Sequence, residues 1–312
     1  MKAGSIGILL VFAIMLSACS SGKRKNSTIS VSGAFALYPM MVKWTEEYKK
    51  ENPKIRFNIS AGGAGKGMAD ALSGAIDLGM VSRDIMPEEK EKGAWWVAVV
   101  MDAVIPTMNA ENPLAQTIKK RGLTREEFRK IYLTGEITNW NQLPGITTDQ
   151  VINVFTRSDA CGAAATWAEF LGGKQEELAG VGVFGDPGLA DAVIKDVKGV
   201  GFNNTVYLYD SRSGVKNQGI DIIPIDVNES GVIEPEEYFY QDLHTVLQAI
   251  GEGKYPSPPA RDLYLVAGGT PRKKAALDFL RWVCTKGQAF VSEAGYVPLS
   301  AESLIESNSK LK

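Results

Sequence analysis

The spacing of hydrophobic residues predicts strands that alternate with helices along most of the chain. Residues 28–32 and 54–60 alternate hydrophobic and polar side chains, which is typical of half-buried strands. Between these segments Met41, Trp44 and Tyr48 recur at helical spacing. Strands that alternate with helices build βαβ units and a mostly parallel sheet. We therefore expect an α/β fold.

Two hydrophobic segments indicate that the chain crosses between two lobes. Residues 97–108 form a long run without helical periodicity, which favours a strand leaving the first lobe. Residues 262–267 form a second strand that brings the chain back. We expect a first lobe made of residues 28–104 and 262–312, and a second lobe made of residues 105–261. A cleft between two lobes is a preferred ligand site.

The same pattern predicts further elements inside each lobe. The expected helices cover residues 68–72, 124–132, 162–171, 188–195, 238–250, 272–285 and 288–293, and the further strands cover residues 75–81, 151–156 and 220–225.

The N-terminal segment has the features of an export signal. Residues 6–16 form a hydrophobic stretch too short to span a bilayer comfortably, and Lys2 precedes it. The stretch ends in Leu-Ser-Ala-Cys19, which resembles a bacterial lipobox, although an ordinary cleaved signal peptide is the alternative. We expect residues 1–18 to be a lipoprotein signal peptide, Cys19 to carry the lipid and residues 19–27 to be a polar tether. The mature protein would then be exported and anchored at a periplasmic or cell-surface membrane face.

Composition and charge exclude some functions. The hydrophobic content of 45% and charged content of 22% are ordinary for a globular protein. A net charge of −2 argues against bulk nucleic-acid binding, which needs a basic face. Besides Cys19 the chain has Cys161 and Cys284, which fall in different predicted lobes. We expect these two to be free thiols.

Four turns rich in Gly, Ala and Ser come just before or inside helix-like segments. They cover residues 32–36, 60–67, 82–84 and 157–163, and two of them contain an arginine. The first backbone N–H groups of a helix are unpaired, and small residues let an anion approach them. Four such turns indicate a chain organised around a small anion.

These segments resemble the phosphate-binding proteins of bacterial and archaeal phosphate ABC importers. The matching segments, in order, are SGAFALYP at 32–39, GGAG at 62–65, IDLGMVSR at 76–83, YLTGEITNW at 132–140, RSDACG at 157–162 and GYVPL at 295–299. The resemblance implies a periplasmic-binding-protein clamshell, in which each lobe is a mixed sheet flanked by helices. It also implies a monomeric, non-enzymatic lipoprotein that delivers inorganic phosphate to a permease.

The resemblance carries over to a set of ligand-binding residues, with Arg157 as the main charge and Asp159 as its ion partner. The candidates are Ala34, Phe35, Ala36, Ala64, Gly65, Ser82, Arg83, Arg157, Asp159, Cys161, Gly162 and Ala163. Family members commonly have Ser or Thr at five of these positions, where this chain has Ala34, Phe35, Ala64, Cys161 and Ala163. Each lost hydroxyl donor removes about 1.5–3 kcal/mol toward a charged acceptor. Another small oxyanion is therefore an alternative ligand.

Residues 226–237 match the pattern of an EF-hand calcium loop. The expected Ca²⁺ ligands are Asp226, Asn228, Ser230, the carbonyl of Val232 and a bidentate Glu237. Gly231 falls at the sharp turn of the loop. The alternative is an acidic surface turn. If the ion is bound, a calcium-stabilised surface sensor or adhesion protein is a further functional alternative.

His244, the only histidine, is expected on an exposed helix face. Cys161 at a helix start would suit a nucleophile with a lowered pKa. A Cys–His hydrolase needs the base within hydrogen-bond reach of the thiol, and nothing in the sequence places His244 there. We therefore expect no enzymatic activity.

Overall fold

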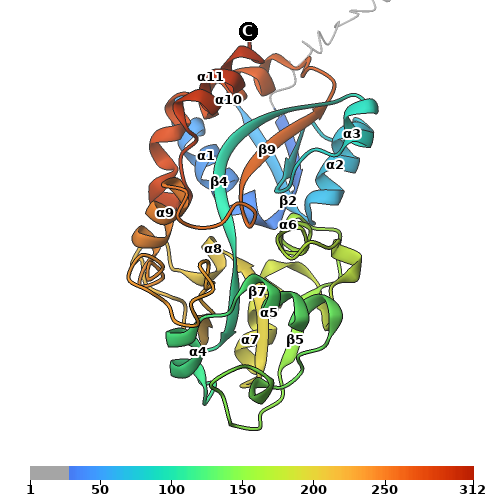
Figure 1. Ribbon diagram of the computed structural model, residues 1–312. Coiled ribbons are helices and arrows are strands. Elements are labelled where there is room, and N and C mark those ends of the chain that lie inside the picture. The colour runs from blue at the N-terminus through green and yellow to red at the C-terminus, as the bar shows by residue number, and fades with distance from the viewer. Residues whose placement is uncertain (1–27) are drawn as a thin grey trace, which may run out of the picture.

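The computed structural model describes residues 28–312. The predicted signal peptide, the lipid attachment at Cys19 and the tether lie outside the described residues. The molecule is elongated and has two α/β lobes stacked end to end (Figure 1). The predicted fold class, a two-lobed α/β clamshell, is confirmed.

The first lobe contains the N-terminal third of the chain and its C-terminal end. Its strands are β1 (Thr28–Gly33), β2 (Arg56–Ala61), β3 (Leu78–Val81), the first part of β4 (Ala94–Asn109) and β9 (Ala260–Gly268). Its helices are α1 (Tyr38–Glu51), α2 (Ala64–Leu72), α3 (Pro87–Glu91), α10 (Lys274–Val283) and α11 (Ala301–Ser309). One hydrophobic core unites these elements.

Helix α1 shows why the local sequence folds as it does. Pro39 lies in its first turn, where a missing N–H costs nothing. Met41, Trp44 and Tyr48 form one buried face of the helix, as their spacing predicts. The Trp44 indole Nε1 donates to the carbonyl of Gly287, 2.9 Å away, so helix α1 is tied to the C-terminal part of the chain.

The second lobe is built around its own core from the middle of the chain. Its strands are the last part of β4, β5 (Asn153–Arg157), β6 (Val181–Val183), β7 (Gly199–Asn204) and β8 (Ile220–Ile222). Its helices are α4 (Ala115–Arg121), α5 (Arg125–Arg129), α6 (Gly162–Phe170), α7 (Gly185–Lys195), α8 (Thr205–Leu208) and α9 (Leu243–Gly251).

A single continuous sheet runs through both lobes, in the order β2-β1-β3-β9-β4-β7-β5-β6, with β8 also paired to β4. Strand β4 pairs with β9 in the first lobe and with β7 and β8 in the second, always antiparallel. The outer pairs, such as β1 with β2 and β5 with β7, are parallel. The expectation of a mostly parallel sheet is therefore wrong, because the long strand that joins the lobes runs against its neighbours (Figure 1).

Some predicted elements differ from those observed. The helix expected at residues 238–250 begins only at Leu243, because the Asp242 carboxylate accepts from the backbone N–H of Thr245 and caps the helix there. Residues 288–293 form 3₁₀ turns rather than a regular helix. Strand β7 was not predicted. Its residues are all buried, so they show no alternation of hydrophobic and polar side chains.

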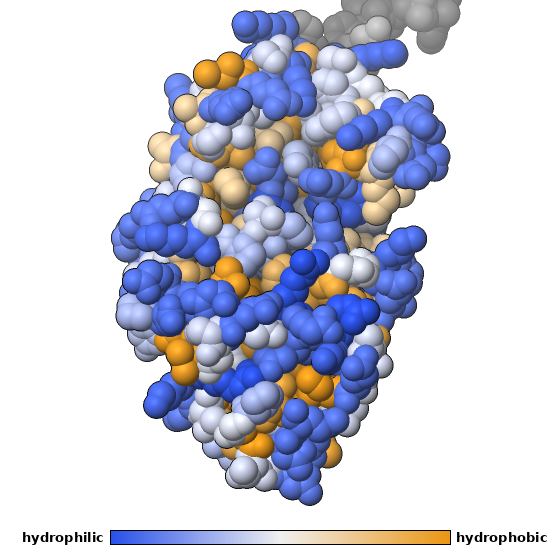
Figure 2. All heavy atoms as spheres, in the orientation of Figure 1, coloured by the Kyte–Doolittle hydropathy of each residue, from blue (hydrophilic) through white to orange (hydrophobic). Residues whose placement is uncertain are grey.

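The surface is mostly polar on the face shown in Figure 2, with hydrophobic residues in scattered patches over both lobes. Within residues 28–312, no helix combines the length and the hydrophobicity needed to cross a membrane.

Candidate anion site between the lobes

Three of the predicted turns meet where the lobes touch. The backbone N–H of Gly65, at the start of α2, donates to the carbonyl of Ala160, 3.1 Å away in the second lobe. Ser82, at the end of β3, lies against Gly162 at the start of α6. A Cβ added at Gly162 would be only 2.0 Å from the Ser82 carbonyl oxygen and 2.2 Å from its Oγ. Small residues in these turns therefore allow backbone from the two lobes to make direct contact.

The first turn is buried close to this contact. The backbone N–H of Ala34 donates to the carbonyl of Met80, 2.9 Å away on β3. Ala34, Ala36 and Ala64 are almost fully buried. Their methyl groups supply no polar contact, so recognition in this region depends on backbone groups and on the second lobe.

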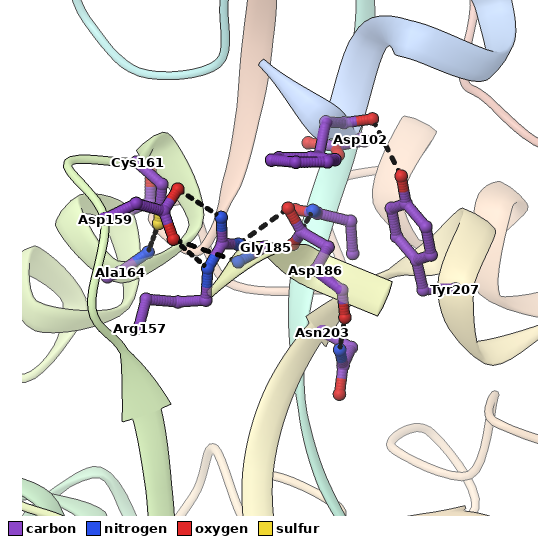
Figure 3. A network of polar contacts seen from close by, with 12 residues as sticks. Asp102, Arg157, Asp159, Cys161, Ala164, Gly185, Asp186, Asn203 and Tyr207 are labelled. Atoms are coloured by element: carbon purple, nitrogen blue, oxygen red, sulfur yellow. Dashed lines mark hydrogen bonds and ion pairs between the residues drawn. The ribbon is translucent and has the colours of Figure 1, made fainter. Parts of the chain in front are cut away.

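Arg157 supplies the charge of the site. It is the last residue of β5, and its side chain is inaccessible to solvent. Nε and Nη2 donate to the two carboxylate oxygens of Asp159 at 2.9 and 2.6 Å, a bidentate pair that fixes the plane of the guanidinium (Figure 3). The Asp159 carboxylate also accepts from the backbone N–H of Gly185 at 3.1 Å.

A second carboxylate, which was not among the predicted site residues, faces the same guanidinium. Asp186, in the first turn of α7, is 2% exposed, and its Oδ2 lies 2.6 Å from Arg157 Nη1 (Figure 3). Burial raises the pKa of the Asp186 carboxyl, although the neighbouring Arg157 lowers it. The available signal was the run Gly185-Asp186-Pro187-Gly188 at the start of a helix, which is rich in small residues like the four turns singled out.

The Arg157 guanidinium still has donor capacity. Nη1 forms an ion pair with Asp186 Oδ2 at 2.6 Å, but within residues 28–312 it makes no hydrogen bond of good geometry. An oxyanion placed in line with the Nη1 N–H bonds would accept the hydrogen bonds that Asp186 does not.

One aromatic ring lies over the arginine. The Arg157 guanidinium carbon lies 5.7 Å from the centre of the Phe35 ring, and Phe35 packs edge-to-face on Phe184 with 5.9 Å between ring centres. The Tyr207 hydroxyl donates to the Phe35 carbonyl at 3.1 Å, which ties the first-lobe turn to the second lobe. These contacts exclude water from the charged group and so strengthen its interactions with an anion.

Asp186 is also connected to the strands that join the lobes. Its Oδ1 accepts from Asn204 Nδ2, and Asn204 Oδ1 accepts from Arg261 Nη2. Arg261 Nε donates to Asp102 Oδ1 at 2.9 Å, and these two residues are opposite each other on β9 and β4. A buried polar network therefore runs from the crossing strands to Arg157.

The Arg83 guanidinium is engaged by a carboxylate of its own lobe. Its Nη1 and Nη2 donate to the Glu89 carboxylate at 2.9 and 2.6 Å, so the guanidinium is turned toward α3. Arg83 also lines an open cavity of about 680 Å³ between the lobes, together with the predicted site residues Gly65 and Cys161.

The two cysteines are free and buried, so the prediction of separate thiols is confirmed for the described residues. Cys161 Sγ accepts from the backbone N–H of Ala164 at 3.4 Å, and the neighbouring Ala163 is buried beside it. Burial raises the pKa of the Cys161 thiol to about 12, which keeps it protonated.

His244 is exposed on α9 and lines a surface groove with Arg212 and Tyr296. The Cys–His arrangement of a hydrolase has no support here.

The predicted calcium loop has a compact conformation. Gly231 has φ of 82° and Glu229 has φ of 60°, so the backbone turns sharply twice. The Asp226 carboxylate accepts from the backbone N–H groups of Ser230 and Gly231 at 3.1 and 2.8 Å. The Glu237 carboxylate reaches back to the N–H of Val227 at 2.7 Å.

The two buried carboxylates of this loop therefore face backbone donors. Asn228 Nδ2 donates to Glu234, and Ser230 Oγ donates to the Val232 carbonyl at 2.9 Å. No group of three or more His, Cys, Asp or Glu side chains within residues 28–312 is arranged to hold a metal ion. Calcium binding at this loop stays a prediction.

Comparison with known proteins identifies the family. Residues 19–286 match the model of the PBP superfamily domain. The chain belongs to this superfamily. It is 27% identical to the phosphate-binding protein PstS of Bacillus subtilis, over 94% of this chain and 93% of that protein. It is 24% identical to the PstS of Methanocaldococcus jannaschii, over 90% of this chain and 86% of that protein.

Solved structures show the same fold. A putative phosphate ABC transporter substrate-binding protein from Clostridium perfringens, solved with bound phosphate, superposes with a TM-score of 0.72 and 24% identity. The match covers 88% of this chain and all of that one. An ABC-type phosphate transport receptor from Vibrio cholerae gives a TM-score of 0.63, with 20% identity, 87% of this chain and all of that one. The resemblance predicted from the sequence motifs is confirmed.

Proposed function

We propose that this protein is an extracytoplasmic substrate-binding protein that captures inorganic phosphate and delivers it to an ABC importer. The relatives named phosphate-binding protein PstS align with this chain over 93% and 86% of their own length. The observation that carries the proposal is the buried Arg157, which lies where the two lobes meet. Its Nη1 is paired with Asp186 but makes no hydrogen bond of good geometry with the described residues. A guanidinium in a water-excluded site is suited to a tetrahedral oxyanion.

Isothermal titration calorimetry tests this proposal. Protein freed of bound anions is titrated with phosphate, arsenate, sulfate and molybdate at physiological ionic strength. We expect phosphate to bind with a micromolar or lower dissociation constant and to be preferred over sulfate. Phosphate affinity no better than about 1 mM, which corresponds to about −4.1 kcal/mol, would contradict the proposal.

A second oxyanion is the alternative, and the replaced hydroxyls favour it. Ala34, Ala64 and Ala163 bring methyl groups to the predicted site, and all three are buried. If sulfate or molybdate binds at least tenfold more tightly than phosphate in the same titrations, this alternative replaces the phosphate assignment.

The anchor is part of the proposal as well. Cys19 follows the lipobox-like residues Leu16-Ser17-Ala18, so we propose that acyl chains attached to Cys19 hold the protein at a membrane. Mass spectrometry of the N-terminal peptide of the membrane-extracted protein should find a lipid-modified Cys19. The variant Cys19→Ala should be recovered without lipid and in the soluble fraction. An unmodified Cys19 in the wild type would show an ordinary signal peptide instead.

A further inference from the structure

We propose that Asp186 is an internal competitor for the Arg157 guanidinium, and that it sets how tightly the site binds an anion. This inference rests on the proposed capture of phosphate at Arg157. The geometry of the guanidinium carries the first step. Asp159 takes the edge formed by Nε and Nη2, while Asp186 Oδ2 lies 2.6 Å from Nη1.

An anion that accepts two parallel hydrogen bonds needs a whole edge of the guanidinium. Because Asp159 holds one edge, the edge between Nη1 and Nη2 is the one left for a ligand. Asp186 Oδ2 is 2.6 Å from Nη1, one of the two nitrogens of this edge (Figure 3). A phosphate oxygen within hydrogen-bond distance of Nη1 therefore has to displace the Asp186 carboxylate or share Nη1 with it.

The charge around Arg157 makes the competition stronger. The carboxylates here are the buried Asp102 and Asp186 and the partly buried Asp159, and the cations are the buried Arg157 and Arg261. With all of these groups ionised, carboxylates exceed guanidinium groups by one. An incoming anion meets like charge in a region of low dielectric constant, where such repulsion is poorly screened. Removing the charge of Asp186 would leave the two arginines balanced by the two remaining carboxylates.

Two asparagines of the second lobe hold Asp186 in this position. Asn204 donates to its Oδ1, and Asn203 Nδ2 donates to its backbone carbonyl at 3.3 Å. Asn204 is in turn fixed by Arg261, which is paired with Asp102 at the crossing strands. The carboxylate is therefore preorganised against Arg157, and moving it breaks a hydrogen bond to Asn204.

Calorimetry of two variants tests the proposal. Asp186→Asn removes the charge, and Asp186→Ala also removes the side chain that stands at the Nη1 edge. We expect inorganic phosphate to bind both variants about tenfold or more tightly than it binds the wild type, because Arg157 gains a free edge and a like charge is lost. Asp191→Asn is the matched control, since Asp191 is also on α7 but is exposed and paired with Lys195 at 2.6 Å. Its phosphate affinity should equal that of the wild type.

The outcomes separate this inference from the proposed function. If the wild type binds phosphate and both Asp186 variants bind it equally or more weakly, Asp186 is not a competitor and the function stands. If neither the wild type nor the variants bind phosphate at millimolar concentration, both ideas are wrong. Loss of a buried ion partner lowers the melting temperature, so circular dichroism must first show that each variant is folded at the titration temperature.

A crystal structure of the wild type with phosphate gives a measurement that needs no variant. We expect a phosphate oxygen within hydrogen-bond distance of Arg157 Nη1 and Asp186 Oδ2 more than about 4 Å from Nη1, outside ion-pair range. Phosphate bound to other groups with the Arg157–Asp186 pair intact would overturn the proposal.

Discussion

At the scale of single residues, the chemistry of the site depends on one arginine between two carboxylates. Asp159 and Asp186 both contact Arg157, whose side chain is fully buried. Breaking a buried ion pair by removing one partner is strongly destabilising, because the other charge stays buried without compensation. Substitutions here must therefore be measured for stability as well as for binding.

Arg157→Lys should weaken phosphate binding about tenfold or more, because an ammonium group cannot donate two parallel hydrogen bonds from one plane. It should also lower the free energy of unfolding by about 1.5–3 kcal/mol, the contribution of a hydrogen bond to a charged group. Calorimetry and urea unfolding measure the two effects. Arg121→Lys is the control, because Arg121 forms a similar pair with Glu127 outside the site and should leave affinity unchanged. Equal phosphate affinity of Arg157→Lys and wild type would place the anion elsewhere.

At the scale of elements, the start of α6 determines how closely the lobes approach. Gly162 leaves no room for a Cβ beside Ser82. The closed arrangement therefore depends on the absence of a side chain at this position, and the glycine is required for its size rather than for a special backbone angle.

Gly162→Ala should force the lobes apart and reduce phosphate affinity about tenfold or more. Overpacking a contact costs about 1–3 kcal/mol, and 1.4 kcal/mol corresponds to tenfold in affinity. Small-angle X-ray scattering in saturating phosphate should give a larger radius of gyration than for the wild type. Gly188→Ala on α7 serves as the control, since the added Cβ meets only a Val183 methyl at 3.1 Å. A Gly162→Ala protein that closes normally would show that the Ser82 contact is adjustable.

The loop between β8 and α9 carries the calcium prediction. Calcium at 100 times its dissociation constant would stabilise the protein by about 2.7 kcal/mol through mass action. We expect millimolar Ca²⁺ to raise the melting temperature of the wild type without changing which anion binds. In Glu237→Gln this rise should largely disappear, because the bidentate carboxylate is lost. Magnesium at the same concentration controls for ionic strength. If the wild type melts at the same temperature with and without calcium, the loop is an acidic turn held by its own backbone amides.

At the scale of the whole molecule, closure must be reversible for ligand to enter. Cys161 belongs to the core of the second lobe and Cys284 to the core of the first. A bond between them would lock the lobes together. Burial raises the pKa of both thiols to about 12, so both should react slowly in the folded state.

Thiol labelling followed by peptide mapping tests this arrangement. In the native exported protein Cys161 and Cys284 should be labelled slowly, and after unfolding in denaturant without reductant both should be labelled completely. Slow labelling reflects burial and the raised thiol pKa, since the thiolate is the reactive form. A peptide in which the two cysteines are linked by a disulfide would contradict both the free thiols and the reversible hinge.

Local patterns in the sequence determined much of this protein. Alternating and helical spacings predicted β1, β2 and α1, because the side chains of a half-buried element alternate or recur with the face that is buried. The long strand β4 was predicted from a continuous hydrophobic run without helical periodicity. Strand β7 was missed because all of its residues are buried, so hydrophobic and polar side chains do not alternate along it. The small residues at helix starts indicated the turns that meet between the lobes. Two backbone segments can approach closely only where the side chains between them are small.

The tertiary structure alone decided which charged groups face each other. Arg83 and Arg157 follow similar turns, yet Arg83 pairs with Glu89 while Arg157 is buried between the lobes. Asp186 is 29 residues beyond Arg157 along the chain, and α7 brings its carboxylate to 2.6 Å from the guanidinium. Local sequence patterns constrain side chains only over one or two turns of backbone. Contacts between β5 and α7 arise from the packing of the whole second lobe, so their partners can be read only from the folded chain.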